Sequence, residues 1–433
     1  MDLFENLSDN QIEAVKTIDE DLEIIACAGA GKTGVVTRRI INILKSNPDI
    51  LPENIVAFTF TEKAAEELKS RVYKYGEAVL GNTKGFANMY IGTVHSFCLK
   101  MLQEYIVQFQ KFTVLDEIKT KLYIEKNYNF CGMPDLGLKI YTETNLFLSV
   151  MSTLNENWFE RDKWDKKTRT AVDKYKDTFY RKNYFDYSLI MQEMLNQLEN
   201  NKNFADIILS KIKYLTVDEY QDTNPIQERL IHFIKQGGCN LCIVGDDDQT
   251  IYQFRGSDPE NILTFRERYE INKYIVLGTD YRSSEAIVDI GKRVIVNNEK
   301  RLPKVMESGK LVKYEEGDTV YREFDECDEE YEFIAKRIKA LHDLGVKYSE
   351  MAVLLRKRKH GPDIAKMFDE YEIPYIIEGV NELFSTAECQ AAKGIFDYLA
   401  GTIGMMELFQ LWKSIDYELD EKEIAEAIAT LNV

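Results

Sequence analysis

The chain alternates short apolar runs with longer stretches in which apolar residues recur at helical spacing. Each short run is rich in β-branched and aliphatic residues and is followed by a polar turn, which predicts buried strands of a parallel sheet. These strands are expected at residues 24–25, 55–60, 90–94, 215–217, 241–244 and 274–277. After the first run, apolar residues repeat at helical spacing between residues 35 and 44, until Ser-Asn-Pro at 46–48 ends the pattern. The succession predicts an α/β fold with helices covering a parallel sheet.

Two changes in this pattern predict domain boundaries. After residue 99 the chain becomes helical, charged and aromatic without a motif, which is typical of an insertion. A second series of elements follows, with strands expected at 320–324, 351–355 and 375–377 and helices near 329–344 and 363–371. We therefore expect a first sheet domain of residues 1–98 and 185–278, a helical insertion of residues 99–184, a partial second α/β domain of residues 279–400 and a helical tail of residues 401–433.

Composition narrows the class of protein. A chain of 433 residues with 45% hydrophobic content is long enough for two or three domains. It has no apolar run long enough to span a bilayer, and its first residues lack the pattern of a signal peptide, so we expect a cytoplasmic protein. The seven cysteines are scattered and odd in number, which favours reduced, structural thiols.

The net charge of −18 is the opposite of what a general nucleic-acid binder carries. A protein that encloses a strand needs only a local basic lining with stacking aromatics. Residues 161–182 combine Lys and Arg with Trp164, Tyr175, Phe179 and Tyr180, which fits such a lining. A solvated helix face explains the segment equally well, and both interpretations stay open.

The segment ACAGAGKT at residues 26–33 has the strand before it and the helix after it that a phosphate-binding loop requires. Gly29 and Gly31 let backbone amides turn inward to hold phosphate, Lys32 reaches the β and γ oxygens, and Thr33 would ligate Mg²⁺. A coincidental glycine-rich turn is the lesser alternative. The predicted nucleotide contacts in and beside this loop are Ala28, Gly29, Ala30, Gly31, Lys32, Thr33 and Gly34.

An acidic pair, Asp218 and Glu219, ends a predicted buried strand. Read alone, such a pair is more often a turn or helix cap. After a phosphate loop, Asp218 is expected to hold Mg²⁺, directly or through water, and Glu219 to polarise the attacking water. We therefore predict catalytic roles for both carboxylates.

Two later segments extend the predicted site. Gln249 follows the strand at 241–244 and could sense a γ-phosphate by hydrogen bonding. Tyr252 and Phe254 could then carry that change to a stacked base, although aromatics beside a strand are commonly core residues. Arg282 could stabilise charge on the transferred phosphate, and Tyr281 could stack on adenine. An isolated Tyr-Arg pair would otherwise be a surface feature.

Together these segments resemble the UvrD, Rep and PcrA group of superfamily 1 helicases, over residues 7–399. The segments are ACAGAGKT at 26–33, FTFTEKAA at 58–65, GTVHSF at 92–97, VDEYQDT at 217–223, GDDDQTIYQFRG at 245–256 and DYRS at 280–283. The resemblance implies a RecA-like P-loop fold with a 1B-like insertion, and an ATP-driven motor that moves 3′ to 5′ on single-stranded DNA or at a junction between single and double strands. Its implied cofactors are ATP and Mg²⁺, and its implied pathways are repair, recombination or defence.

The resemblance also implies further contacts. LSDNQ at 7–11 matches the adenine-reading segment with Gln11 as the reader, and Arg39 lies where a nucleotide-contacting arginine is expected. Phe254 replaces the more common tryptophan, and the segment that contains Tyr187 matches the family only in part. The implied DNA contacts are Phe60, Thr61, Thr93, His95, Tyr187, Tyr252, Phe254 and Arg255.

One departure from the family is large. Family members continue into an inserted 2B domain and two later motifs, one of which supplies another phosphate-contacting arginine, and neither motif occurs here. We therefore expect a truncated, split or degenerate relative in which the C-terminal motifs are absent. An arginine finger is worth about 10³ to 10⁵ in rate, so binding should survive better than turnover. A non-motor ATP- and DNA-binding subunit that needs a second chain is the alternative, and an unrelated phosphate-loop kinase leaves residues 245–256 unexplained.

Overall fold

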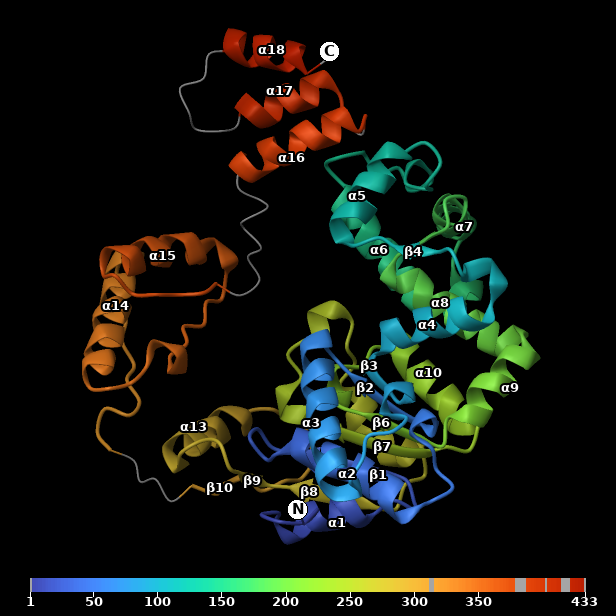
Figure 1. Ribbon diagram of the computed structural model, residues 1–433, viewed down its shortest axis with the longest axis vertical. Helices are drawn as coiled ribbons and strands as arrows, with labels where there is room; N and C mark the ends of the chain where they lie inside the picture. Colours follow the sequence, from blue (N-terminus) through green and yellow to red (C-terminus); the bar gives the residue numbers. More distant parts are fainter. Residues whose placement is uncertain (1, 311–314, 378–386, 402, 414–420, 432–433) are drawn as a thin grey trace. The chain divides into compact units, whose positions relative to one another are not determined.

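The computed structural model describes residues 2–310, 315–377, 387–401, 403–413 and 421–431 (Figure 1). It divides into two compact units, residues 1–319 and 320–433. All of the predicted site residues fall in the first unit. No helix in the described part of the chain is long and apolar enough to cross a membrane.

The first unit is built around a six-stranded parallel sheet with the order β3-β2-β6-β7-β1-β8. The central strand β1 pairs Ile24 with Val244 on one side and Ile275 on the other. Its strands are β1 (Leu22–Ala26), β2 (Ile55–Thr59), β3 (Tyr90–Thr93), β6 (Tyr214–Val217), β7 (Asn240–Gly245) and β8 (Tyr274–Leu277). This arrangement confirms the predicted α/β fold with a parallel sheet.

Two hydrophobic cores lie on the two faces of the sheet. Side chains alternate along β2, so Val56 and Phe58 join one core while Ile55 and Ala57 join the other. One face is covered by α1 (Asp9–Lys16), α2 (Lys32–Ser46) and α3 (Glu62–Leu80). Residues packed on the other come from α4 (Val94–Tyr105), α8 (Tyr187–Asn200), α9 (Lys202–Lys211), α10 (Pro225–Gln236), α11 (Glu260–Leu263) and α12 (Phe265–Arg268). Burial on both faces explains why these strands are apolar throughout.

Between α4 and α8 the chain is helical, as the pattern predicts. The elements are α5 (Glu117–Lys126), α6 (Thr144–Glu156), α7 (Lys166–Tyr180) and a two-stranded sheet of β4 (Thr113–Val114) and β5 (Tyr184–Phe185). Tyr175 and Phe179 of α7 are buried in the core, while Lys174 and Lys176 pair with Asp135 and Glu193. Within the segment 161–182, these two aromatic residues are therefore core residues and are unavailable to stack on bases.

The chain that follows β8 stays in the first unit. It forms β9 (Thr279–Asp280), α13 (Glu285–Ile295) and β10 (Glu307–Ser308), and β9 and β10 pair in a parallel two-stranded sheet. The compact unit thus extends about forty residues beyond the position expected for the domain boundary, because this segment packs against the strand ends of the main sheet.

The described part of the second unit contains helices and no strand. The helices are α14 (Cys327–Asp343), α15 (Gly361–Glu370), α16 (Ala387–Leu399), α17 (Met405–Lys413) and α18 (Glu421–Thr430). The strands expected at 320–324, 351–355 and 375–377 are therefore wrong. Leu354 and Ile376 in these segments are 94% and 92% exposed, and in the described part of the chain no strand pairs with these segments.

Candidate nucleotide and nucleic-acid site

The predicted phosphate loop lies between the carboxyl end of β1 and the start of α2. Gly29 and Gly31 adopt φ values of +70° and +80°, which favour glycine. Gly31 is the N-cap of α2, and no side chain caps the helix. The first turn therefore presents backbone N–H groups to an anion, with Lys32 at the first helical position. Phosphate binding by this loop stays a prediction.

The segment after β8 closes against this loop. The Tyr281 amide donates a hydrogen bond to the Gly29 carbonyl oxygen at 3.1 Å. A Cβ added to Gly29 would come within 1.9 Å of the Asp280 carboxylate and 2.9 Å of the Arg282 Cβ. Asp280 is held there by the amides of Arg282 and Ser283, at 2.6 and 3.0 Å. The fold thus brings Tyr281 and Arg282 to the phosphate loop within the first unit, and both side chains are exposed. Their roles at the phosphate and the adenine stay predictions.

Gln11 also lies against the loop. Its side-chain amide donates to the Ala30 carbonyl oxygen at 2.9 Å, and its Oε1 accepts from the Ser8 amide at 2.9 Å. This capping box fixes the start of α1 beside the phosphate loop. Adenine recognition by Gln11 stays a prediction.

Arg39 is a correction to the predicted nucleotide site. It is 1% exposed, and its guanidinium donates to the Ala14 carbonyl oxygen and to Asn240, each at 3.2 Å. Helix α2 is buried on nearly all sides at this turn, so Arg39 joins α1 to β7 rather than reaching the loop. Counting along the motif does not reveal this, because the burial of a helix face depends on its neighbours.

The acidic pair lies at the carboxyl end of β6, two strands from β1 in the sheet order. Lys32 Nζ lies 2.6 Å from Glu219 Oε2. Glu219 adopts φ of +51°, a conformation uncommon for residues other than glycine, which turns the chain sharply after the strand. Its Oε2 also accepts from the Gln221 side-chain amide at 2.8 Å. The predicted lysine and carboxylate are therefore in direct contact.

Two neighbouring carboxyl groups have perturbed acidity. Burial and the Glu219 carboxylate raise the pKa of Asp218 to about 6 and that of Asp222 to about 7. Asp222 Oδ1 is buried without a hydrogen-bond partner. A cation would relieve both groups, and the Thr33 hydroxyl and Asp218 carboxylate are oxygen donors of the kind that Mg²⁺ takes. The residues fit the predicted Mg²⁺ ion, which stays a prediction.

Gln249 lies in the same polar network. Its side-chain amide donates to Asp246 Oδ2 at 2.5 Å, and the Asp246 amide donates to Gln221 Oε1 at 3.0 Å. Gln221 and Asp222 belong to the VDEYQDT segment, and neither was predicted to have a role. Their position two and three residues after Glu219 could have indicated a role at the site, because a tight turn returns such residues to the strand end.

A groove of about 870 Å³ runs from the carboxylates to a set of aromatic side chains. Asp218, Glu219 and Asp222 line one part of it. Six of the eight predicted DNA contacts also line the groove: Phe60, Thr61, Thr93, His95, Tyr187 and Tyr252. The fold therefore joins two of the predicted catalytic residues, Asp218 and Glu219, with most of the predicted DNA contacts in one cavity.

The aromatic side chains are arranged for stacking. Phe60 and Tyr252 are stacked with ring centroids 5.0 Å apart, and Tyr252 lies 6.0 Å from Phe254. Phe254 is 78% exposed, which contradicts the alternative that it is a core residue. Phe254 and Arg255 lie in a 3₁₀ turn (Gln253–Arg255), and the side chain of Arg255 lies outside the described part of the structure.

His95 and Tyr187 meet edge to face with centroids 5.5 Å apart. Burial lowers the pKa of His95 to about 4, so the imidazole is neutral at physiological pH. A neutral ring is suited to contact a base by stacking or hydrogen bonding rather than to neutralise a phosphate. The DNA-contact assignments stay predictions.

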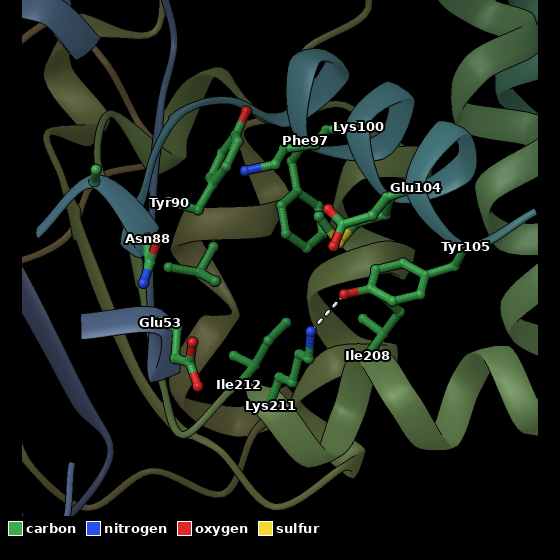
Figure 2. Close-up of a pocket in the computed structure, with 13 residues that line it drawn as sticks. Glu53, Asn88, Tyr90, Phe97, Lys100, Glu104, Tyr105, Ile208, Lys211 and Ile212 are labelled. Carbon is green, nitrogen blue, oxygen red and sulfur yellow. Dashed lines mark hydrogen bonds between the residues drawn. The ribbon is translucent and has the colours of Figure 1, made fainter. Parts of the chain in front are cut away.

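A second pocket, of about 200 Å³, lies at the other end of the sheet (Figure 2). Glu53 and Asn88 lie just before β2 and β3, and Tyr90 begins β3. Figure 2 shows Lys211 pointing toward Tyr105 across this pocket, and its ammonium donates to the tyrosine hydroxyl. Ligands of open parallel sheets bind at the carboxyl ends of the strands, so this pocket is separate from the candidate site.

Comparison with known proteins shows which protein families this chain resembles. A family model described as the UvrD/REP helicase N-terminal domain matches residues 7–270, and one described as the UvrD-like helicase C-terminal domain matches residues 275–403. The chain is 32% identical over 412 residues to the ATP-dependent DNA helicase PcrA of Staphylococcus epidermidis, covering 92% of this chain and 54% of the relative. It is 32% identical over 415 residues to PcrA of Staphylococcus aureus, with the same coverage. The chain thus spans about half the length of these relatives.

The second match corrects one expectation. We expected only part of a second motor domain, with its C-terminal motifs absent, whereas the C-terminal domain model matches a continuous 275–403. The domain is therefore present.

Proposed function

Because the chain belongs to the UvrD/REP helicase family, we propose that it is an ATP-dependent DNA motor that hydrolyses ATP on single-stranded DNA and moves 3′ to 5′. The membership confirms the resemblance recognised from the motifs. ATP with Mg²⁺, a single strand or junction as the track, and a cytoplasmic place of action are parts of this proposal, because the chain covers only part of its relatives.

The groove carries the proposal. It places Asp218 and Glu219 and the aromatic residues Phe60 and Tyr252 in one cavity. A nucleotide-binding protein without a polymer substrate needs the carboxylates but has no use for a line of aromatic rings beside them. A shared cavity supports coupling, because a base that shifts at one end displaces side chains that also face the hydrolytic end.

Each group at the loop has a chemical task. The amides at the start of α2 hold the β-phosphate, and Lys32 leaves Glu219 to contact the β and γ oxygens. Glu219 then accepts a proton from the attacking water, and Arg282 and Gln249 stabilise charge on the transferred γ-phosphate. Mg²⁺, held by Thr33 and Asp218, would neutralise phosphate charge when it is bound. Tyr281 is placed to stack on the adenine, and Phe254 on a base of the strand.

Steady-state ATPase activity measured with and without single-stranded DNA tests this function. Low salt is needed because phosphate contacts weaken steeply as salt rises. Strong stimulation by DNA supports the motor. Tight nucleotide binding with negligible turnover at saturating DNA would overturn the motor function in favour of a binding subunit. The ATPase would then be measured again after addition of a candidate partner chain.

A further inference from the structure

Lys304 is a nearly fully buried lysine that the proposed mechanism does not use. Its side chain is 1% exposed, and it lies after α13 in the loop that leads to β10. Its ammonium contacts Asp246, lies 2.5 Å from Asp247 Oδ1 and lies 3.0 Å from Asp248 Oδ2. A buried ammonium is stable only with such partners, so this lysine is committed to the three aspartates that follow β7.

Arg301 and the backbone reinforce this attachment. Arg301 makes a bidentate pair with Asp248, with both N···O distances 2.7 Å. The Leu302 amide donates to Asp247 Oδ2 at 2.8 Å. The cluster thus sets two cations against three carboxylates, and the side chains of Asp246 and Asp247 are each 3% exposed. Loss of Lys304 would leave these two carboxylates buried beside each other without a cation.

Asp246 connects the cluster to the nucleotide site. One of its carboxylate oxygens contacts Lys304, and the other accepts from the Gln249 side-chain amide at 2.5 Å. Its backbone amide donates to Gln221, whose own amide donates to Glu219 at 2.8 Å. Asp246 is therefore held on one side by Lys304 while it orients Gln249 on the other.

The segment that carries Lys304 is anchored to the nucleotide site at both ends. At its start, Asp280 packs against Gly29 of the phosphate loop. At its end, Lys304 is bound to Asp246 and Asp247. Any change that shifts this segment acts on both the loop and Gln249.

We propose that Lys304 is a positioning residue that fixes the Asp246 carboxylate and, through it, holds the Gln249 side-chain amide in place to distinguish a γ-phosphate. The inference rests on the proposed use of ATP at this site. It assigns Lys304 no contact with the nucleotide.

The test measures affinity for a non-hydrolysable ATP analogue and for ADP, for the wild type, Lys304→Met, Gln249→Ala and the double variant. We expect Lys304→Met to lower the preference for the analogue by roughly tenfold or more, as Gln249→Ala does, with ADP affinity nearly unchanged. The preference of the double variant for the analogue should be no lower than that of Gln249→Ala. The proposal would be overturned if the losses of the two single variants multiply in the double variant, or if affinity for the analogue and for ADP falls equally.

Two further variants separate positioning from folding. Lys300→Met removes an exposed lysine of the same segment that pairs with Glu260, and should leave the preference unchanged. Lys304→Met combined with Asp247→Asn restores the charge balance of the cluster, so it is expected to fold even where Lys304→Met does not. Its preference for the analogue should stay low, and recovery to the wild-type value would overturn the Lys304–Asp246 link.

These binding measurements are distinct from the ATPase test. If the wild type prefers the analogue but shows no DNA-stimulated turnover, the motor function is overturned, and the variants still decide the positioning role. A wild type with no preference for the analogue overturns the positioning role.

Discussion

Lys32 Nζ and Glu219 Oε2 lie 2.6 Å apart, so the two side chains expected to act on ATP are bound to each other. They come from the start of α2 and the end of β6, and the sharp turn at Glu219 aims its carboxylate back at the loop. A triphosphate that draws Lys32 onto its own oxygens breaks this pair and frees Glu219. We therefore propose that ATP binding and the release of Glu219, the expected base, occur as one event.

Lys32→Ala is expected to weaken ATP binding strongly. The substitution removes the cation that reaches the β and γ oxygens, and hydrogen bonds to charged groups are worth about 1.5 to 3 kcal/mol, or roughly 10- to 150-fold in affinity. Titration with a fluorescent ATP analogue measures the loss. Lys69→Ala, at an exposed lysine of α3 that pairs with Glu66, is the control and should bind normally. Equal affinity in the Lys32 variant and the wild type would remove Lys32 from the site.

Glu219→Gln is expected to keep ATP binding and to stop turnover. The amide cannot accept the proton of the attacking water, and loss of a general base costs about 10² to 10⁴ in rate. Affinity should be unchanged or higher, because Lys32 no longer has to leave a charged partner. Steady-state ATPase and analogue titration together measure this separation.

Glu66→Gln, which breaks an exposed ion pair on α3, serves as the control and should turn over at the wild-type rate. An ATPase rate for Glu219→Gln equal to that of the wild type would assign the base role to another carboxylate. Asp222 would then be the first candidate, since it is buried beside Glu219 and its pKa is raised to about 7.

The parts of the site that sequence reasoning found are local. The phosphate loop and the acidic turn are short segments in which residue type determines backbone conformation, so Gly31, Lys32 and Glu219 follow from the motifs. The contacts of Asp280 with Gly29 and of Lys304 with Asp246 join residues far apart in the chain, and no local pattern predicts them.

The errors have the same origin. Periodicity predicted strands in the second unit, but a strand exists only with a partner, and residues such as Leu354 have none in the described structure. Arg39 was assigned from its place in the family resemblance, whereas the packing of α2 against α1 and β7 decides where it points. Fold class depends on pattern and was predicted correctly, while these failures depend on tertiary neighbours.

Phe254→Ala is expected to weaken binding of single-stranded DNA by about 1 to 3 kcal/mol, or roughly 5- to 150-fold, because an exposed ring offers a stacking surface to a base. DNA stimulation of the ATPase should fall in parallel, while the basal rate stays unchanged. Fluorescence anisotropy with a labelled oligonucleotide measures the affinity. Phe396→Ala, at a ring of α16 that is 72% exposed, is the matched control. Unchanged affinity in both variants would leave Phe254 without a role in binding the strand.

Gly29→Ala and Gly81→Ala separate backbone strain from close approach. The two glycines have nearly the same φ, +70° and +72°, so an added Cβ strains both. At Gly29 that Cβ would lie 1.9 Å from Asp280 Oδ1, whereas at Gly81 nothing lies within 4 Å. Gly81→Ala should cost about 1 kcal/mol of stability and bind ATP normally. Gly29→Ala should also push away the segment with Tyr281 and Arg282, which lowers ATP affinity at least tenfold. Thermal-shift assays measure the stability of both variants, and binding assays measure their ATP affinity. Equal ATP affinity in the two variants would contradict this coupling.

Glu23→Gln is expected to change how stability depends on pH. Glu23 lies in β1 with an exposed fraction of 0% and pairs with Arg266 at 2.9 Å, and burial raises its pKa from 4.5 to about 7. Between these pH values the folded chain keeps a proton that the unfolded chain has lost. The contribution of Glu23 to the free energy of unfolding therefore falls as pH rises through this window, by up to about 1.4 kcal/mol per pH unit. The glutamine variant carries no such proton, so its Tm relative to the wild type should be higher at pH 8 than at pH 5.

Glu77→Gln, at an exposed position of α3, is the control, and its Tm should differ from that of the wild type by the same amount at both pH values. If Glu23→Gln behaves like this control, the buried carboxyl does not set the pH dependence.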